Sequence, residues 1–348
     1  MKIALTIFIG SAGLGLPLQP AHAQGTLTPP GPPAATMLTL TQVEPRTPIS
    51  SVPYTITQSG AYYLTTSLTV NGGNAITIAT NGVALDLNGF TISSTAPSPT
   101  GYGILIGSSL RNITIANGFI QGGVTNNGSG AYSGTGFDYG IYFTGNPPGN
   151  VLVSHVSVSG CLIIGIYVYN GAGSTLAESC TVQTIGSDGI FASTVKQSSA
   201  VDCGGDAVYG DLVFDSRGES TDAGSGITAN DIVQNCYGYA SGDADGVSAV
   251  NIQNCYGYSG SYIGISGTTA INCYGFSNSD HGILVENAEN CFGYSSGSGY
   301  GVYAYNVASG CYGYSNTGVG LYALIASVCH GATGTGTALD PLHNVNSY

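Results

Sequence analysis

The sequence predicts an all-β protein built as a β-solenoid, in which short coils of chain stack on one another as parallel strands. The first observation is a series of similar units, each opening on a cysteine and an aromatic residue, that restart every 18 to 20 residues. These units begin at Cys236, Cys255, Cys273, Cys291 and Cys311. The second observation is a glycine followed by Ile, Val or Leu nine or ten residues after each cysteine, which divides the unit into two half-coils. Such short periods, with β-branched and aromatic residues alternating, are typical of solenoids.

The alternation of side chains along a strand predicts a narrow interior lined by small residues. Successive side chains of a strand point to opposite faces. If Cys273 lies inside, Gly275 also lies inside, and Tyr274 and Phe276 point outward. In the second half-coil the same parity places Ile283 inside. Each coil is therefore expected to be thin.

Asparagine residues stand directly before four of the repeating cysteines, at the point where one coil passes into the next. They are Asn235, Asn254, Asn272 and Asn290. At a coil spacing of about 4.8 Å their side chains would hydrogen-bond to one another as a ladder. Asparagine also tolerates the left-handed backbone of tight turns, and both explanations can hold together.

All nine cysteines are predicted to occupy one such turn column as buried thiols. They are Cys161, Cys180, Cys203, Cys236, Cys255, Cys273, Cys291, Cys311 and Cys329. Parallel strands in register keep neighbouring Cβ atoms about 4.8 Å apart, which exceeds the usual disulfide separation of about 3.8 Å. The thiols should therefore act as small apolar residues rather than disulfides, and no metal site is expected.

Four segments are expected along the chain. Residues 1–23 combine Lys2, an apolar run and the pattern Ala21-His22-Ala23, which is typical of a cleaved secretory signal in bacteria. Residues 24–48 are rich in Pro, Thr and Gly and are interpreted as a linker with an N-terminal cap, residues 49–329 as the solenoid, and residues 330–348 as a C-terminal cap that loses the register. The mature protein is expected to be periplasmic or extracellular, with no transmembrane segment.

The N-terminal half of the solenoid should contain larger coils than the C-terminal half. Residues 121–138 are rich in Gly, Asn and Ser without periodicity, which predicts a long loop leaving the solenoid. With every cysteine assigned to one column, the coils between residues 161 and 236 have irregular lengths. We therefore expect any shaped binding site in that region.

Composition narrows the classes of partner. Only 7% of the residues are charged, and 5 Lys and Arg face 18 Asp and Glu, for a net charge of −13. Nucleic-acid binding depends on basic contacts and is not expected. Tight binding of anionic glycans is also disfavoured, because the protein itself is negatively charged, unless metal ions bridge the charges. No cofactor is expected, and a bridging calcium ion is the one alternative left open. The protein is expected to be a monomer.

The chain resembles the exported right-handed parallel β-helix repeat proteins of the pectin-lyase-like superfold. The resemblance rests on EPRTPISSVPYTITQSGAYYLTTSLTV, on VALDLNGFTIS and on the repeated Gly-Ile and Asn-Cys pairs, which span most of residues 44–329. It implies a single-stranded right-handed parallel β-helix. It also implies a carbohydrate-related function, since members of the superfold include pectate lyases, hydrolases, epimerases and non-catalytic carbohydrate-binding proteins. A fold alone does not choose among these activities.

Candidate catalytic residues are few. Asp188 and Asp245 directly precede the glycine of the second half-coil, but an assumed gap of four coils would keep them more than about 15 Å apart. Hydrolysis needs clustered carboxylates, and elimination or epimerisation needs a base beside a neutralising cation. The remaining candidates are Asp206, His281, Arg217 and Glu219. Arg217 and Glu219 have the simpler interpretation of an exposed ion pair, and His281 that of a solvated turn residue.

The outward stripe beside the Gly-Ile column offers a binding surface instead. The stripe reads Leu105, Tyr142, Tyr167, Phe191, Tyr209, Thr228, Ser248, Ser266, Leu284, Tyr303 and Tyr322. Its aromatic members Tyr142, Tyr167, Phe191 and Tyr209 suit contact with sugar rings, although stacked aromatic side chains can equally serve to stabilise neighbouring coils. The sequence therefore favours a non-catalytic polysaccharide-binding or surface-structural protein, with a polysaccharide or cell-surface glycan as partner. The alternative is a polysaccharide lyase, glycoside hydrolase or uronate epimerase.

Overall fold

The computed structural model describes residues 44–345. The predicted secretory signal and nearly all of the predicted linker lie outside these residues. Between residues 44 and 345 the chain forms strands and turns without α-helices, and so contains no helix able to cross a membrane.

The N-terminal strands form the larger coils. They are β1 (Thr47–Ile49), β2 (Tyr54–Ile56), β3 (Gly60–Leu64), β4 (Leu68–Val70), β5 (Ile76–Ile78), β6 (Val83–Asp86), β7 (Thr91–Ser94), β8 (Tyr102–Ile106) and β9 (Arg111–Gln121). A hairpin of β10 (Gly123–Asn126) and β11 (Tyr132–Thr135) follows.

The middle coils are made by strands of more variable length. They are β12 (Tyr139–Phe143), β13 (Gly149–Cys161), β14 (Ile164–Tyr167), β15 (Thr175–Glu178), β16 (Thr181–Ile185), β17 (Asp188–Phe191), β18 (Thr194–Lys196), β19 (Ser199–Cys203) and β20 (Val208–Phe214).

The C-terminal coils alternate a short strand and a longer one. They are β21 (Arg217–Ser220), β22 (Ile227–Gln234), β23 (Tyr237–Ala240), β24 (Val247–Gln253), β25 (Tyr256–Ser259), β26 (Ile265–Ile271), β27 (Tyr274–Ser277), β28 (Ile283–Glu289), β29 (Phe292–Ser295), β30 (Val302–Ser309), β31 (Tyr312–Ser315), β32 (Val319–Ser327), β33 (His330–Thr333) and β34 (Thr337–Val345).

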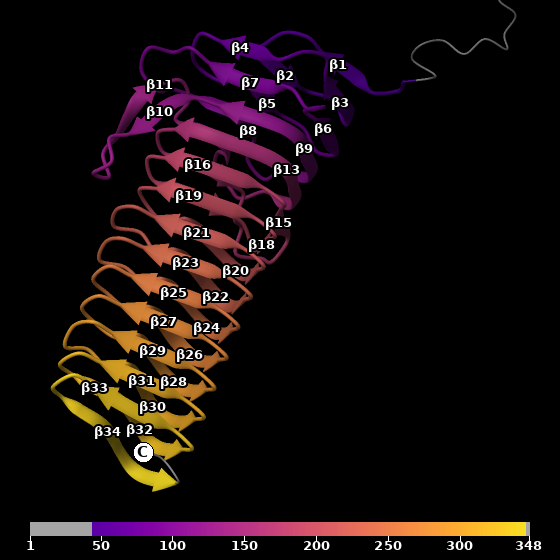
Figure 1. Cartoon of the computed structure of the whole chain (residues 1–348). Coiled ribbons are helices and arrows are strands. Elements are labelled where there is room, and N and C mark those ends of the chain that lie inside the picture. Colours follow the sequence, from indigo (N-terminus) through magenta and orange to yellow (C-terminus); the bar gives the residue numbers. More distant parts are fainter. Residues whose placement is uncertain (1–43, 346–348) are drawn as a thin grey trace, which may run out of the picture. The chain divides into compact units, whose positions relative to one another are not determined.

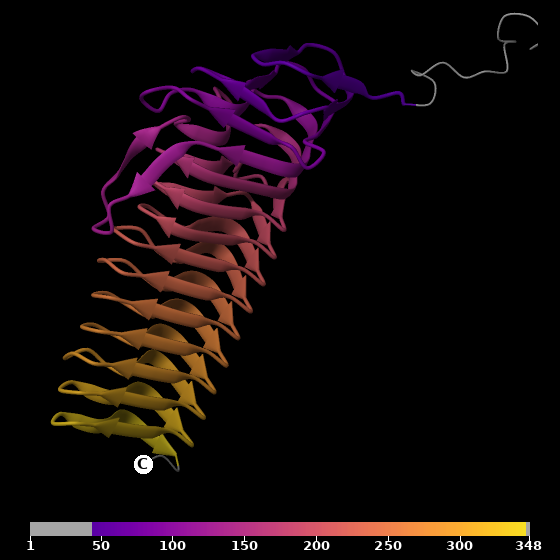
Figure 2. The same ribbon diagram turned by 45° about the horizontal axis from the view of Figure 1, so that its top comes forward.

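Each strand of a coil pairs in parallel with the equivalent strands of the coils before and after it, so the chain is a parallel β-helix (Figure 1 and Figure 2). Strand β25 pairs with β23 and β27, and β26 pairs with β24 and β28. In the C-terminal half Val247 lies opposite Ile265, whereas in the N-terminal half Ile113 lies opposite Val151, in a coil about twice as long. The predicted fold class and the larger N-terminal coils are confirmed.

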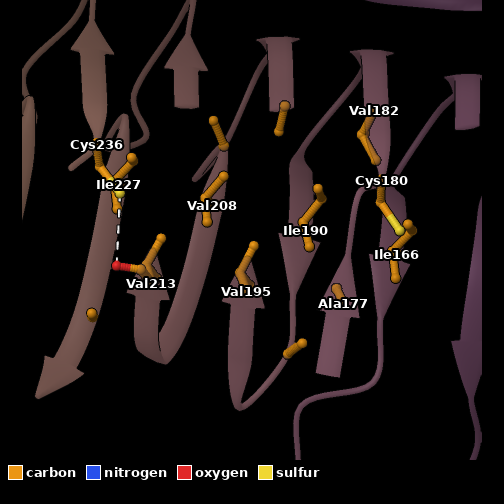
Figure 3. Close-up of a cluster of buried hydrophobic side chains, with 14 of the residues drawn as sticks. Ile166, Ala177, Cys180, Val182, Ile190, Val195, Val208, Val213, Ile227 and Cys236 are labelled. Carbon is orange, nitrogen blue, oxygen red and sulfur yellow. Dashed lines mark hydrogen bonds between the residues drawn. The ribbon is translucent and has the colours of Figure 1, made fainter. Parts of the chain in front are cut away.

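The interior follows the predicted alternation. In strand β28 the side chains of Ile283 and Val285 are fully buried, whereas Leu284 between them is partly exposed. Figure 3 shows the same inward layer in the middle coils, where Ile190, Val208 and other small apolar side chains stack from coil to coil. One apolar column therefore runs through the stack.

Glycine on the short strand sets the thinness of the C-terminal coils. A Cβ atom at Gly275 would overlap the carbonyl oxygen of Gly282, across the interior of the same coil. The equivalent overlap occurs at Gly238, Gly257, Gly293 and Gly313. The two half-coils thus approach so closely that a side chain larger than hydrogen has no room between their backbones.

The asparagines at the coil junction combine both properties that the sequence suggested. Asn235, Asn254 and Asn272 have left-handed backbones, with φ between 54° and 56°. The Asn254 side-chain amide donates a hydrogen bond to the Asn235 side-chain oxygen at 3.1 Å, and Asn272 donates to Asn254 at 3.2 Å. Asn235 in turn donates to Asp215 at 2.9 Å. Asn235, Asn254 and Asn272 form the asparagine ladder. Asn290, which was expected to continue it, shares the left-handed backbone with φ of 52°, but no hydrogen bond joins its side chain to that of Asn272.

The cysteines do not form one column, so that prediction was wrong. Cys161 pairs with Ile185, and Ile185 with Cys203, at the far end of the short strand. The column that precedes the short strand consists instead of Cys180, Ser198, Ser216, Cys236, Cys255, Cys273, Cys291, Cys311 and Cys329. A small inward residue fits both before the short strand and at its far end, so the sequence could not show which of the two positions a cysteine occupies. All nine cysteines are buried and free.

The corrected assignment gives regular coils from Cys180 to Cys236. The coil before them is longer, since Cys161 pairs with Ile185 and Tyr167 with Phe191, 24 residues further along the chain. Hydrogen bonds link Cys180 to Ser198, Ser198 to Ser216, and Ser216 to Cys236, at intervals of 18, 18 and 20 residues. These are the intervals of the C-terminal repeats. The reason for expecting a binding site from Cys180 to Cys236 is therefore lost.

In the column before the short strand, the side chain at each position bonds to backbone on both sides. The backbone N–H of Cys236 donates to Cys255 Sγ at 3.4 Å, and the N–H of Ser198 donates to Ser216 Oγ at 3.2 Å. The Cys255 thiol donates to the carbonyl oxygen of Gln253 at 3.1 Å. Serine and cysteine thus fill the same role, and the thiols are more than the small apolar residues that the sequence suggested.

The strand pairing refines one further expectation and corrects another. The long loop expected at residues 121–138 does leave the stack, but residues 123–135 within it pair as an antiparallel hairpin that the sequence did not predict (Figure 1). Residues after Cys329 keep the register: β33 pairs with β31 and β34 pairs with β32. The last stretch continues the β-helix because its small residues meet the same demands as those of the earlier coils.

Replacing Gly275 by Ala should destabilise the protein by about 3 kcal/mol or more, because the added methyl group meets backbone rather than a movable side chain. Urea unfolding followed by circular dichroism measures the change. Gly149→Ala is the control, since a Cβ atom there would lie 3.6 Å from Arg111 Cγ, an ordinary contact. Equal stability of the two variants would contradict the tight coil.

Cys255→Ser should leave the free energy of unfolding within about 0.5 kcal/mol of the original, because serine already occupies this column at Ser198 and Ser216. Cys255→Ala should cost about 1 to 2 kcal/mol, since the N–H of Cys236 loses its acceptor in a buried site. Urea unfolding of both variants distinguishes them. If Ala were tolerated as well as Ser, the hydrogen-bonding role of the column would be disproved.

Candidate functional site

The outward stripe predicted from the sequence forms one column across successive coils. Register pairs link Leu105 to Tyr142, Tyr167 to Phe191, Phe191 to Tyr209, Tyr209 to Thr228, Thr228 to Ser248, Ser248 to Ser266, Ser266 to Leu284, Leu284 to Tyr303, and Tyr303 to Tyr322. From Tyr142 to Tyr322 these side chains are partly exposed. We call this column the stripe.

The rings of the predicted binding residues stack on one another. The ring centroids of Tyr142 and Tyr167 lie 5.3 Å apart, those of Tyr167 and Phe191 lie 5.5 Å apart, and those of Phe191 and Tyr209 lie 4.8 Å apart. The ring faces therefore cover each other along the stack. The row therefore presents ring edges and tyrosine hydroxyl groups outward.

The C-terminal end of the stripe has a different arrangement. Tyr303 and Tyr322 stack at 4.7 Å, but Tyr305 meets Tyr303 edge-on, with planes 70° apart, and is 53% exposed. Tyr300 likewise stands at 83° to Tyr303. At this end, rings that cross the stack leave ring faces open to solvent. Tyr300 and Tyr305 were not identified from the sequence because they lie outside the repeating column.

Between the aromatic ends, the stripe carries small hydroxyl side chains beside a buried carboxyl group. Ser266 donates one hydrogen bond to Asp245 and approaches Ser248 at 3.0 Å between the hydroxyl oxygens. Asp245 Oδ1 is buried and has no hydrogen-bond partner among the described residues. Burial raises the pKa of Asp245 to about 6, against the opposing effect of the Ser266 hydrogen bond.

Asp188 and Asp206 lie in the same column as Asp245, and their side chains accept hydrogen bonds from backbone N–H groups. Asp188 and Asp206 are on neighbouring coils, and Asp245 follows two coils after Asp206, so Asp188 and Asp245 are three coils apart and not four. Asp188 accepts the N–H of Asp206 at 3.1 Å, and Asp206 accepts the N–H of Ser225 at 2.8 Å. Burial is the main reason why the pKa values of Asp188 and Asp206 are raised.

His281 continues this column toward the C-terminal aromatic end. Its Nδ1 accepts the N–H of Tyr300 at 3.1 Å and lies 2.9 Å from Asp280 Oδ1. Burial lowers the pKa of His281, and the carboxylate of Asp280 opposes this effect. Because Nδ1 accepts the amide hydrogen, the neutral ring with its proton on Nε2 fits the site. His281 stacks on Tyr303 at 5.8 Å, which is a packing role.

Arg217 and Glu219 lie away from the stripe, on the short strand β21. Arg217 Nε donates to Glu219 at 3.0 Å, and the guanidinium lies 5.5 Å from the centre of the Tyr237 ring. Arg217 is 56% exposed and bonds along its own strand, as the ion-pair interpretation expected. Among residues 44–345, no three His, Cys, Asp or Glu side chains converge as metal ligands would.

A groove along one side of the C-terminal coils was not identified from the sequence. It has a volume of about 1120 Å³ and follows the asparagine ladder on one side and the ring column of Tyr237, Tyr256, Tyr274, Phe292 and Tyr312 on the other. We call it the ladder groove. Both walls were recognised separately in the sequence, as a turn column and as an aromatic column. The sequence did not show that the asparagine column and the aromatic column, with the inward cysteines between them, form the two walls of one groove.

The hairpin β10–β11 is fixed to the stack by a polar cluster. Tyr132 donates to Asp202 at 2.9 Å and lies 2.6 Å from the Thr221 hydroxyl oxygen, while Asn126 donates to Asp202 at 2.7 Å. Asp202 lies near the end of strand β19, and Thr221 directly follows strand β21. The hydrogen bonds of the hairpin side chains thus run to Asp202 and Thr221 and not to the row from Tyr142 to Tyr209.

Comparison with known proteins adds little to this geometry. No protein-family model and no curated protein sequence matches the chain. The GH136 lacto-N-biosidase from Eubacterium ramulus is similar over 85% of this chain and 60% of its own, so this chain spans less than two thirds of that protein; the identity is 12% and the TM-score 0.32. The A-module of the mannuronan C-5 epimerase AlgE4 from Azotobacter vinelandii is similar over 83% of this chain and 89% of its own, with 12% identity and a TM-score of 0.35.

The buried carboxyl group of Asp245 should make the protein more stable at pH 5 than at pH 7.5. Its pKa is about 6 in the folded chain and near 3.8 when unfolded, so the folded state binds the proton more tightly. Stability from this group is full below pH 4 and is lost as the pH rises through 6. The expected difference between pH 5 and 7.5 is about 1 kcal/mol, measured by urea unfolding.

Asp245→Asn should remove this part of the pH dependence, because the amide keeps an acceptor for Ser266 and does not ionise. Asp243→Asn is the control, since Asp243 is exposed two residues away. An unchanged pH slope in Asp245→Asn would contradict the burial of this carboxyl group.

Proposed function

We propose that this protein binds a neutral or weakly charged polysaccharide along the stripe and does not catalyse a reaction on it. The observation that carries the proposal is the continuity of the stripe from Tyr142 to Tyr322. Aromatic side chains stand at both ends, and the hydroxyl side chains of Thr228, Ser248 and Ser266 lie between them, followed by Leu284. A straight row of this kind suits a chain molecule better than a single sugar.

The chemistry of the stripe supports a sugar polymer. Tyrosine combines an apolar ring with a hydroxyl group, so one side chain can contact the C–H groups and the hydroxyl groups of a sugar. The open faces near Tyr305 offer stacking, and the hydroxyl groups of Ser248 and Ser266 offer hydrogen bonds. The stacked rings from Tyr142 to Tyr209 are already ordered by their neighbours, which lowers the entropy lost on binding.

Catalysis is not supported by the arrangement of the candidate acids and bases. Asp188 and Asp206 hold backbone N–H groups, and one oxygen of Asp245 is buried while the other accepts from Ser266. Arg217 and Glu219 lie on a strand column other than that of Asp245. A lyase or epimerase would need a base and a cation at the same sugar.

Replacing Tyr167 and Phe191 together by Ala should weaken retention by the polysaccharide about tenfold or more, because two neighbouring ring contacts are lost. Affinity electrophoresis through gels containing soluble polysaccharides measures the effect. The matched control is Phe276→Ala with Tyr294→Ala, a stacked pair at 4.9 Å that lies outside both the stripe and the ladder groove.

Equal retention of the two double variants would refute binding along the stripe. The unaltered protein is also incubated with the same polysaccharides, and new reducing ends and unsaturated products are assayed. Product formation abolished by Asp245→Asn would replace the binding proposal by the enzymatic one.

A further inference from the structure

We propose that the ladder groove is a second binding site, which holds an uncharged polysaccharide chain parallel to the axis of the β-helix. The groove lies on the turn before the short strands, whereas the stripe lies on the longer strands. The inference stands on different residues and does not rest on the stripe.

The shape of the groove favours an extended ligand. Its lining repeats once per coil, with an asparagine on one wall, a buried cysteine at the base and an aromatic ring on the other wall. Stacked rings form the aromatic wall, with centroids 5.1 Å apart for Tyr237 and Tyr256 and 5.1 Å apart for Tyr256 and Tyr274. A ligand lying along the groove meets the same pair of groups at every coil, which suits a polymer of similar units.

The asparagine ladder has unused hydrogen-bonding capacity. An asparagine side chain has two N–H donors and an oxygen with two lone pairs. Asn254 spends one N–H on Asn235 and one lone pair on the amide of Asn272. One donor and one acceptor therefore remain for a ligand, side by side on a rigid support. Neighbouring hydroxyl groups of a sugar ring, which both donate and accept, match this pair.

The charges of the groove favour a neutral ligand. From Asn235 to Tyr312 its lining residues are Asn, Cys, Tyr, Phe and Gly, without a charged side chain. The charges at its other end are already engaged: Asp215 accepts from Asn235, and Arg217 pairs with Glu219. A charged polymer would lose hydration on entering the groove without gaining an opposite charge there.

The aromatic wall supplies apolar contact despite its stacking. Tyr237 and Tyr274 are 36% and 37% exposed, which places them among the exposed large side chains of the described chain. Their edges face the groove because the faces of Tyr274 are covered by Tyr256 and Phe292, and those of Tyr237 by Tyr256 and the guanidinium of Arg217. Ring edges carry apolar C–H groups and the tyrosine hydroxyl group, so the wall can contact both kinds of sugar surface.

The test uses the full chain and four uncharged probes, namely dextran, hydroxyethyl cellulose, galactomannan and xyloglucan, with alginate and polygalacturonate as anionic comparisons. The double variant Asn254→Gly with Asn272→Gly removes two amides, and glycine keeps the left-handed backbone without strain. At least one uncharged probe should retain this variant about tenfold more weakly than the unaltered protein. The anionic polymers should not retain the unaltered protein.

The control is Asn278→Gly, which removes an exposed amide bonded to Tyr258 outside the groove, and it should leave retention unchanged. A second variant, Tyr274→Ala, tests the opposite wall and should also weaken retention. Circular dichroism and the number of titratable thiols before and after denaturation show that each variant is folded.

The outcomes separate this inference from the proposed function. If the groove variants bind every probe as the unaltered protein does, while Tyr167→Ala with Phe191→Ala loses retention, the groove inference is overturned and the stripe remains. If only the groove variants lose retention, the stripe is overturned and the groove remains. If the unaltered protein is retained by none of the probes, the groove inference is refuted.

Discussion

The close approach of two backbones inside each C-terminal coil is the constraint on which the rest of the structure depends. Because Gly275 faces the carbonyl oxygen of Gly282, the coil has no room for large inward side chains. Every Tyr and Phe of the repeat must therefore point outward, and the interior is left to Cys, Ser, Ala, Val and Ile. The aromatic columns and the grooves between them follow from an interior that is too thin to hold rings.

The tight turn between coils supplies the second constraint. One residue in a left-handed conformation reverses the chain, and asparagine adopts this backbone at less cost than most residues. The N–H that follows points along the stack to the Cys or Ser side chain of the next coil. A backbone polar group that would otherwise be buried without a partner is satisfied by the repeat itself. Outside the same turn, the asparagine amides bond to each other and form a wall.

Much of the fold could be predicted because the repeat carries its own register. The alternation around Cys273 and Ile283 correctly separates inward from outward residues, and the stripe from Leu105 to Tyr322 lies in one column as expected. The prediction of a single cysteine column failed because Cys161 and Cys203 lie at the far end of the short strand, whereas the other cysteines precede it. Small inward residues identify the interior but not which corner of it they occupy.

The candidate site was less predictable for a related reason. The burial of Asp245 and the crossing of Tyr305 over Tyr303 within strand β30 do not follow from the repeat period. The ladder groove arises from two columns that the sequence shows one at a time. Parity tells which side chains point outward, but the hollow between outward columns depends on turn curvature, which parity does not describe.

The continuous coil-to-coil strand pairing from Cys236 to strand β34 gives the protein a modular length. Each coil of 18 to 20 residues contacts only its neighbours, so its stability is approximately a sum of coil and interface contributions. Recombination between repeats as similar as those at Cys255 and Cys273 would add or remove one whole coil without disturbing the others. Gene duplication within this region would therefore change the length of the stripe and of the ladder groove while leaving the side chains that each coil presents unchanged.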